Sequence, residues 1–329
     1  MLIPPRLKAG DEIRVIAPSN SAFIISAATR EEATRKLNNL GLKVTFSKNF
    51  EEKDEFNSSS VTTRLNALHD AFADQNVGGI LTVKGGFNSN QLLKKIDYNL
   101  VRRNAKIFCG YSDITALSNA IYKKCNFQTY IGPHYSTFGI KKDFDYILDH
   151  FVKFCFHNTN KLLITPSTFW SNDAWYLDQE NRKFIKNEGY SILNHGSAIG
   201  TLIGGNLNTL VNLNGTEFMP DFDNAIMCLE VTVENTPQNF DAMLVSLILQ
   251  PNFEQVKGIL IGRFEKASEI SLHLLRLIIS SKEELNNIPV ICGLDFGHTE
   301  PQLTIPLGGT CEIVANVDDL KIYFSNEGL

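Results

Sequence analysis

Several features that point to nucleic acid, membrane or secretion are absent from the sequence. Acidic residues outnumber basic ones, giving a formal net charge of -5, and no dense Lys/Arg stripe offers contacts to a phosphate backbone. No stretch reaches the about 18 apolar residues of a membrane span, and residues 1–30 lack the pattern of a secretion signal. We therefore expect no nucleic-acid partner, no membrane association and a cytoplasmic location.

Cysteine is scarce and widely spaced. The six cysteines form no CxxC pair, whereas disulfide and zinc frameworks have clustered spacings, so we expect reduced, structural thiols. They are Cys109, Cys125, Cys155, Cys228, Cys292 and Cys311. Cys109 is also a candidate nucleophile, but it lies inside a strand-like run. Ser112 lies on the turn that follows and is the better candidate.

Length and composition indicate a folded protein of two domains. Hydrophobic residues make up 43% and charged residues 20% of the chain, which is the globular range. A chain of 329 residues exceeds the usual size of one domain. We expect two domains, or one domain with a large appendage.

The first half alternates short apolar runs with helical patterns, which is typical of a parallel sheet covered by helices. Strands are predicted at 11–18, 42–46, 79–83 and 105–109, and helices at 26–40, 62–73, 91–96 and from Asp113. Right-handed crossovers place a ligand site beyond the carboxyl ends of such strands. The loop after 79–83 and Ser112 both fall at such ends.

The organisation changes after residue 156. Residues 157–192 are polar and aromatic without a sustained period, and we interpret them as a linker with a long loop or lid. Further on, a helix is predicted at 240–249, strands at 258–261 and 289–292, and a strand-rich ending at 302–324. We therefore predict an N-terminal α/β domain at 1–156 and a mixed α/β domain at 193–329.

Ser112 lies on a predicted strand-to-helix turn. Such a turn exposes the serine oxygen and points the following backbone N–H groups at the same space, as a nucleophile requires. The match to a nucleophile elbow is loose, because Ile114 replaces the usual second glycine. Taken alone, a plain helix cap formed by Ser112 or Asp113 is the simpler interpretation.

The segment Lys84-Gly-Gly-Phe87 allows three interpretations: an oxyanion hole, a phosphate-binding loop or a plain turn. Gly85 and Gly86 lack the spacing of the nucleotide motifs GxGxxG and GxxxxGK[ST]. Adjacent glycines after a buried strand let the backbone approach a ligand, with N–H groups free to hold an oxyanion. The motif alone does not choose between an oxyanion hole and a turn.

A serine nucleophile needs a base, and usually a carboxylate that orients the base. Of the seven histidines, His298 is the strongest candidate because it follows a predicted strand in a glycine-flanked loop; His134 is its rival. Glu230 ends an apolar run, where an unpaired carboxylate is costly. Glu234 and Asp295 are rival acids, and a buried structural ion pair is the alternative role for Glu230.

These motifs together resemble the LD-carboxypeptidase family of serine peptidases, and within it the branch of microcin C immunity proteins. They are Gly85 to Leu93, Gly110 to Thr115, Gly204 to Leu210, Leu229-Glu230, Phe296 to His298 and Pro306 to Gly309. The resemblance covers nearly the whole chain. It implies a flavodoxin-like parallel-sheet N-terminal domain and a smaller, strand-rich mixed α/β C-terminal domain, with the active site between them.

The resemblance also implies site residues. It places the catalytic triad on Ser112, Glu230 and His298, and the oxyanion-hole amides on Gly86 and Asp113. One departure is Val231, where many relatives have Asp after the acid. Neither a metal nor a cofactor is implied, and family members are commonly homodimers.

Substrate contacts are expected from the same resemblance. The segments 169–175 and 178–182 resemble the aromatic loop of the immunity proteins, so Trp170 or Trp175 is expected to stack on a nucleotide base; lid packing is the alternative. The other residues expected to contact the substrate or shape the cleft are Gly85, Asn88, Asn206 and Asn208. For Asn206 and Asn208, capping of local turns is the alternative.

Three functions follow. The first is hydrolysis of an amide-type bond in a small molecule, an aminoacyl or peptidyl nucleotide such as processed microcin C, which gives resistance. The second is release of D-Ala from a murein tetrapeptide. The third is non-catalytic binding of a nucleotide or muropeptide. An aromatic residue that stacks on adenine favours the first, and a basic pocket for a free carboxylate favours the second.

Overall fold

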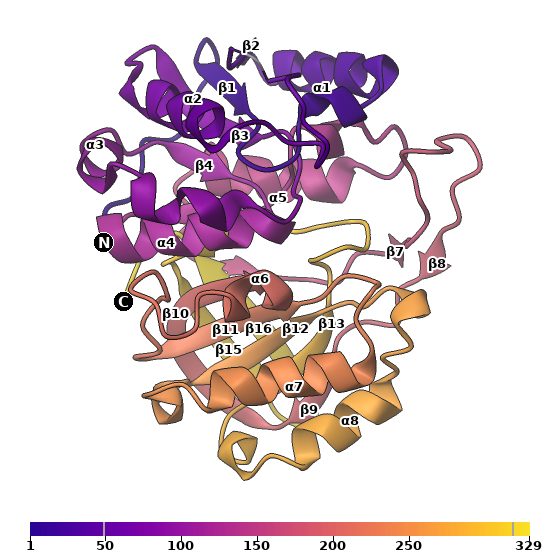
Figure 1. The fold of residues 1–329 in the computed structure, drawn as a ribbon. Coiled ribbons are helices and arrows are strands. Elements are labelled where there is room, and N and C mark those ends of the chain that lie inside the picture. Colours follow the sequence, from indigo (N-terminus) through magenta and orange to yellow (C-terminus); the bar gives the residue numbers. More distant parts are fainter. Residues whose placement is uncertain (49, 318) are drawn as a thin grey trace.

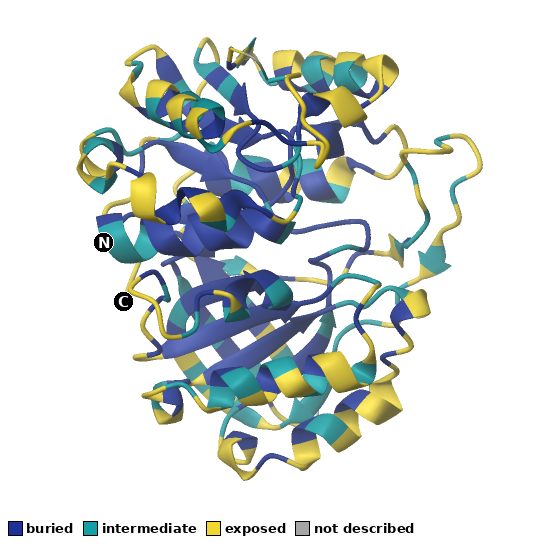
Figure 2. Cartoon of the chain, in the orientation of Figure 1, coloured by how far each residue is buried: buried dark blue, intermediate teal, exposed yellow. Residues whose placement is uncertain are grey.

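The computed structural model describes residues 1–48, 50–317 and 319–329. Its N-terminal half, indigo to magenta in Figure 1, lies against its C-terminal half, orange to yellow. Each half is built around one sheet, and the central strands of both sheets are largely buried in Figure 2. The predicted α/β class, with a parallel-sheet first half and a strand-rich second half, is confirmed.

The first sheet has the strand order β14-β5-β4-β3-β1-β2. Its strands are β1 (Glu12–Ile16), β2 (Lys43–Phe46), β3 (Val77–Thr82), β4 (Ile107–Cys109), β5 (Thr129–Ile131) and β14 (Ile305–Leu307). Strands β1 to β5 pair in parallel in the flavodoxin-like order 2-1-3-4-5, and β14 joins β5 antiparallel.

Helices cover both faces of this sheet because successive strand residues point to opposite sides. Phe108 packs in one hydrophobic cluster with the helices α2, α3 and α4, and its neighbour Ile107 packs in another with α1 and α5. The helices are α1 (Ala27–Asn39), α2 (Val61–Ala73), α3 (Tyr98–Arg103), α4 (Thr115–Cys125) and α5 (Asp145–Cys155). Ser26 and Ser60 cap α1 and α2 by accepting backbone hydrogen bonds.

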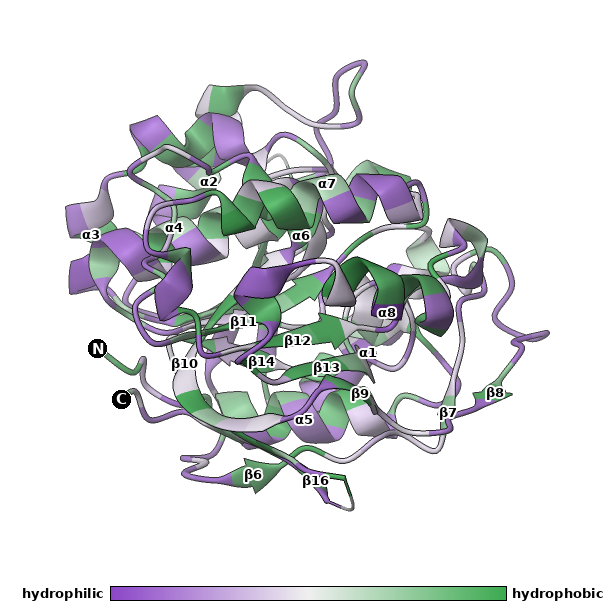
Figure 3. Ribbon diagram, turned by 90° about the horizontal axis from the view of Figure 1, so that it is seen from below, coloured by the Kyte–Doolittle hydropathy of each residue, from purple (hydrophilic) through white to green (hydrophobic). Residues whose placement is uncertain are grey.

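The second sheet is mixed and has the order β6-β16-β15-β10-β11-β12-β13-β9. Its strands are β6 (Leu162–Leu163), β9 (Ser191–Asn194), β10 (Gly196–Asn206), β11 (Ala225–Glu230), β12 (Gly258–Gly262), β13 (Val290–Leu294), β15 (Thr310–Ala315) and β16 (Leu320–Ser325). Strands β10 to β13 are parallel, and Figure 3 shows β11 to β13 as hydrophobic. This side also carries α6 (Leu207–Val211), α7 (Pro237–Ile248) and α8 (Leu272–Ser280).

Some elements differ from the prediction. The helix expected at 91–96 is a 3-10 turn, η2 (Ser89–Lys95), and a second one, η3 (Ser112–Ile114), precedes α4. The remaining 3-10 turns are η1 (Ala22–Ile24), η4 (Ser136–Gly139), η5 (Phe253–Gln255), η6 (Lys266–Ser268) and η7 (Glu283–Leu285). The 157–192 segment, expected to lack regular structure, contains β6 and a small two-stranded sheet of β7 (Phe169–Trp170) and β8 (Ile185–Lys186).

Strand pairing crosses the predicted domain limits. β14 lies in the range expected for the second domain but completes the first sheet, and β6 lies in the expected linker but joins the second sheet. The division at 157–192 and the homodimer stay predictions. No helix in the described ranges combines the length and apolar character needed to cross a bilayer.

The two halves are joined where α4 packs on β10. The side chain of Asn119 donates to the carbonyl of Gly204 at 2.8 Å and accepts from its N–H at 3.1 Å. Thr115 Oγ1 accepts from the backbone N–H of Asn206 at 2.9 Å. A Cβ at Gly205 would lie 2.5 Å from Thr115 Oγ1, so a glycine is needed for this approach. The helix that follows Ser112 is thereby fixed to the second sheet.

Replacement of Asn119 should weaken this junction. Asn119→Ala leaves two buried backbone groups of Gly204 without partners, so we expect the free energy of unfolding to fall by about 2–4 kcal/mol in urea denaturation. Asn38→Ala, at an exposed position within α1, is the matched control and should change it by less than about 0.5 kcal/mol. Equal losses in the two variants would contradict the role of the junction.

Candidate active site

Loops at the carboxyl ends of four strands meet between the two sheets. Gly85 and Gly86 follow β3, Ser112 follows β4, Glu230 ends β11 and His298 follows β13. All but Glu230 line one cavity of 640 Å³. The first sheet supplies the serine and the second supplies the histidine and the acid.

Ser112 has a φ of 60°, a left-handed conformation that non-glycine residues seldom adopt and that often marks functional sites. A Cβ at Gly85 would lie 2.7 Å from Ser112 Cβ and 2.8 Å from its Oγ, and one at Gly110 would lie 2.1 Å from Thr82 Oγ1. Because both residues are glycines, the turn that carries Ser112 can pack closely against β3 and the loop that follows it. Within the described residues 112–125, α4 begins without a side-chain cap, so the plain helix-cap interpretation does not explain Ser112.

Ser112, His298 and Glu230 form a continuous hydrogen-bonded series. His298 Nε2 lies 3.1 Å from Ser112 Oγ, and His298 Nδ1 lies 2.7 Å from Glu230 Oε2. Glu230 is only 2% exposed, and Gly297 makes room for it because a Cβ there would lie 2.9 Å from Oε2. The predicted serine, base and acid are thus brought together.

The rival candidates lie in other contacts. His134 Nδ1 bonds to Thr82 Oγ1 at 2.8 Å, and its ring stacks on Tyr111 at 4.2 Å between centroids. Burial, and secondarily the charge of Lys84, hold the pKa of His134 well below its ordinary value, so this imidazole is neutral. Glu234 faces the cavity but makes no hydrogen bond to His298 among the described residues.

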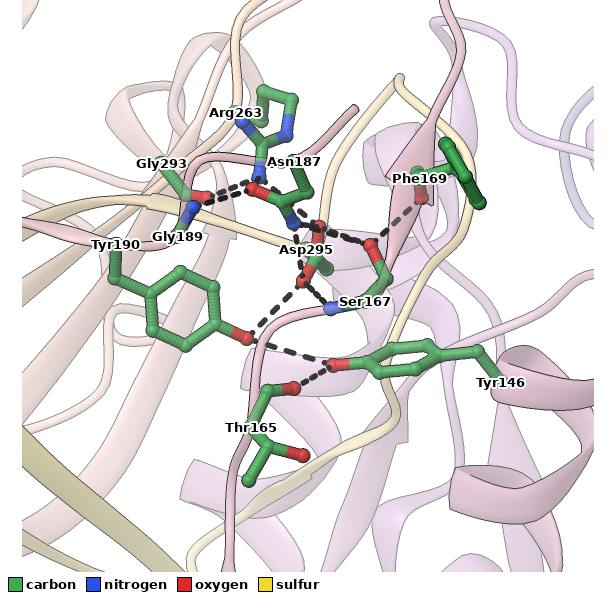
Figure 4. A network of polar contacts seen from close by, with 10 residues as sticks. All are labelled: Tyr146, Thr165, Ser167, Phe169, Asn187, Gly189, Tyr190, Arg263, Gly293 and Asp295. Carbon is green, nitrogen blue, oxygen red and sulfur yellow. Dashed lines mark hydrogen bonds and ion pairs between the residues drawn. The ribbon is translucent and has the colours of Figure 1, made fainter. Parts of the chain in front are cut away.

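Asp295, the other rival acid, belongs to a separate network. It accepts from Ser167 N–H at 2.9 Å, from Asn187 Nδ2 at 3.2 Å, from Tyr190 Oη at 3.2 Å and from Arg263 Nη2 at 3.2 Å. In Figure 4 these side chains surround the carboxylate. Ser167 and Asn187 flank the β7–β8 excursion, so Asp295 anchors the base of the aromatic loop.

Two opposing effects set the protonation of His298. Burial by itself lowers the pKa of the imidazole, but the charge of Glu230 and its hydrogen bond raise it, with help from Glu265 and Glu300. The net result is a raised pKa. Such an imidazole is a stronger base than a free histidine.

The two residues expected to form the oxyanion hole lie in the same region as the serine: Gly86 lines the cavity that Ser112 lines, and Asp113 follows Ser112 in the chain. The Asp113 nitrogen is 3.4 Å from the position that a Cβ would take at Gly85. Neither amide donates a hydrogen bond to another of the described residues. The Asp113 carboxylate accepts from Ser19 Oγ at 2.6 Å and from Ser89 N–H at 2.8 Å, which ties the glycine loop to the serine turn.

The two tryptophans differ in position. Trp175 lines the cavity together with Tyr176, whereas Trp170 is not among its lining residues. The Arg263 guanidinium instead lies over the Trp170 ring, 5.0 Å from its centroid. Of the two candidates for base stacking, only Trp175 therefore lines the cavity that Ser112 lines.

The three predicted asparagines lie outside the cavity lining. Asn88 is buried, and its Oδ1 accepts from Arg64 at 3.1 Å. Asn206 caps α6 by accepting from the N–H of Thr209 at 3.1 Å. Asn208 exchanges hydrogen bonds with Asn235 at 2.8 and 2.9 Å. Gly85 does line the cavity, but the asparagines support the loops around it.

The structure adds cavity residues that sequence reasoning did not select. Lys84, Glu265 and Glu300 line the cavity. Burial raises the pKa of the Glu300 carboxyl to about 7, against the opposing charges of Arg182 and His298. The sequence could have indicated two of these residues by their proximity to predicted site residues, since Lys84 precedes the glycine pair and Glu300 follows His298 by two positions. Neither here nor elsewhere in the described ranges is a cluster of three or more His, Cys, Asp or Glu side chains placed to hold a metal ion.

A serine, a histidine and an acid in hydrogen-bonding series is the arrangement that serine peptidases use, and the family match points to the same class. The chain belongs to the LD-carboxypeptidase family: the models of the family's N-terminal and C-terminal domains match residues 13–132 and 199–313. The resemblance inferred from the sequence is confirmed.

Two curated relatives illustrate the range of the family. The chain is 48% identical to "Putative carboxypeptidase YocD" of Bacillus subtilis, covering 97% of this chain and 98% of the relative. It is 28% identical to "Microcin C7 self-immunity protein MccF" of Escherichia coli, covering 100% and 97%.

Solved structures match over the whole chain. An MccF-like protein from Bacillus anthracis superposes with a TM-score of 0.98 at 47% identity, covering 99% of this chain and 100% of that one. MccF in complex with glutamyl sulfamoyl guanosine gives a TM-score of 0.90 at 27% identity, covering 100% of both chains.

The coupling between His298 and Glu230 can be measured directly. In an NMR titration, the pKa of His298 should lie above its ordinary 6.5 and should fall in Glu230→Gln, because the carboxylate charge is lost while burial remains. The His298 signals are assigned by their loss in His298→Asn. Glu234→Gln is the matched control; a shift as large as that of Glu230→Gln would contradict the assignment of Glu230.

Proposed function

We propose that the protein is a serine hydrolase that cleaves an amide-type bond through an acyl-enzyme. Ser112 Oγ attacks the carbonyl carbon while His298 Nε2 takes the hydroxyl proton and returns it to the leaving group. Glu230 orients His298, and the amides of Gly86 and Asp113 donate to the oxyanion. Water then attacks the acyl-serine by the same proton route.

One observation carries this proposal: the series from Ser112 through His298 to Glu230, at 3.1 and 2.7 Å, opens onto a cavity. A buried structural ion pair would explain Glu230 and His298 alone. It would not explain why Nε2 points at a serine held in a left-handed conformation at the cavity wall. The three groups have the order and the spacing that nucleophilic catalysis requires.

An aminoacyl or peptidyl nucleotide such as processed microcin C is the substrate class we favour. Trp175 and Tyr176 line the cavity, and aromatic faces of this kind stack on bases. The microcin C7 self-immunity protein MccF has been solved in complex with aspartyl sulfamoyl adenosine as well as with glutamyl sulfamoyl guanosine. Hydrolysis of such a compound would give resistance.

The second candidate is an LD-carboxypeptidase that removes D-Ala from a murein tetrapeptide. Lys84 supports it, because a cation in the cavity suits a free carboxylate. The curated relatives include a "Probable murein peptide carboxypeptidase" of B. subtilis, which agrees with it. The two candidates share the same bond-breaking groups and differ in what lies beyond the bond.

Removal of the serine oxygen tests the mechanism. Ser112→Ala should lower kcat on processed microcin C or on the murein tetrapeptide by roughly 10⁴- to 10⁶-fold, because no other group forms the acyl-enzyme. Ser118→Ala, in the helix that follows, is the matched control and should keep full activity. Undiminished hydrolysis in Ser112→Ala would refute the mechanism, and binding without turnover in the wild type would favour a non-catalytic binding protein.

The two tryptophans should behave differently toward nucleotide substrates. Trp175→Ala should raise KM for processed microcin C by about 5- to 150-fold, because stacking on a base contributes about 1–3 kcal/mol. Trp170→Ala is the matched control and should change KM less than twofold, because its ring packs on Arg263 outside the cavity. An equal rise of KM in the two variants, or a larger rise in Trp170→Ala, would show that Trp175 only packs the loop.

A further inference from the structure

Lys84 occupies a special place in the cavity. It follows β3, directly before Gly85, and lines the same cavity as Ser112 and His298. The described part of the lining contains no other lysine or arginine, whereas Asp173, Glu234, Glu265 and Glu300 contribute carboxylates. An anionic group entering this cavity would meet one cation among several acids.

This cation has no anionic partner among the residues that the structure describes. Arg182 pairs with Asp173 at 2.6 Å and Arg263 with Asp295 at 3.2 Å, but Lys84 forms no ion pair or side-chain hydrogen bond with any of the described residues. Its Nζ lies 5.1 Å from the centroid of the Tyr176 ring. The ring faces the ammonium group without neutralising it, and holds it at the cavity wall.

The lack of a partner has an energetic consequence. Lys84 is half-buried, and this burial lowers the pKa of its ammonium group. A partly desolvated charge without a partner is unfavourable, and it gains most from an anion that arrives with the ligand. Buried charged side chains in proteins are normally paired with an opposite charge. The missing partner of Lys84 therefore points to an anion that comes from outside the chain.

We propose that Lys84 binds an anionic group of the substrate next to the scissile bond and so determines which substrates are accepted. The position follows from the backbone: the next residue, Gly85, contacts Ser112, and Gly86 is the proposed oxyanion donor. The anion is the terminal carboxylate of a peptide or the phosphoryl group of an aminoacyl nucleotide. This inference rests on the proposed function and names the charge that its substrate carries.

The test pairs each anionic substrate with an uncharged counterpart. One pair is the murein tetrapeptide ending in D-Ala and the same peptide ending in D-alaninamide. The other pair is the aspartyl phosphoramidate of adenosine and an aspartyl adenosine joined by a plain 5′-amide. For Lys84→Met, kcat/KM on the anionic member of at least one pair should fall by about 10- to 100-fold, mainly through KM.

The controls separate binding from structure. The uncharged substrates should change less than twofold, Lys84→Arg should restore most of the loss, and exposed Lys95→Met should match the wild type. The unfolding midpoint of Lys84→Met should equal or exceed that of the wild type, because an unpaired half-buried charge is removed while the apolar stem remains. The pair that responds identifies the carboxylate or the phosphoryl group as the natural partner.

Several outcomes would overturn the proposal. The first is an equal loss of kcat/KM for Lys84→Met on charged and uncharged substrates. The second is no loss on either anionic substrate. The third is a wild-type protein that neither binds nor hydrolyses either anionic substrate. Calorimetric binding of the anionic substrates to Ser112→Ala, with and without Lys84→Met, makes the result independent of catalysis. If Ser112→Ala still hydrolyses the substrate, the proposed mechanism fails, while a loss of binding in Lys84→Met would still support the anion site.

Discussion

The attachment of α4 to β10 is the constraint on which the site depends. Ser112 belongs to the first sheet and His298 to the second, so the 3.1 Å between them holds only if the two sheets keep a fixed relation. Asn119 enforces that relation through both backbone groups of Gly204, and leucines of α4 and α6 share one hydrophobic cluster with β10. A rigid junction suits hydrogen-bonded catalysis, which tolerates little misplacement of its groups.

Close backbone contact is the second organising feature. Gly85 lies against the serine, Gly297 against the acid and Gly205 against α4, and at each position a Cβ would come within 3.0 Å of another group. The sequence therefore has little freedom at these points even though these three glycines take no direct part in the proposed chemistry. Much of the site geometry therefore depends on glycines, which allow close approach because they carry no side chain.

The sequence predicted the parallel first sheet and the residues at its strand ends, because strand-helix alternation and strand ends are local patterns. It could not predict that β14 joins β5, because three residues carry no information about a partner far away in the chain. Nor could it separate Trp170 from Trp175, since their loop has no period that fixes which side chain faces inward. Asn88, Asn206 and Asn208 were ambiguous for a chemical reason: the same amide serves equally as a cap, a network partner or a ligand contact.

The return of β14 to the first sheet bears on how the chain is made. Synthesis on the ribosome proceeds from the N-terminus, so β5 emerges long before residues 305–307 that cover it. Until then the first sheet has an open edge, which can pair with strands of other chains. The nascent N-terminal half is thus exposed to aggregation while residues 132–304 are made. A shortened messenger that ends before β14 would yield a product with that edge permanently uncovered.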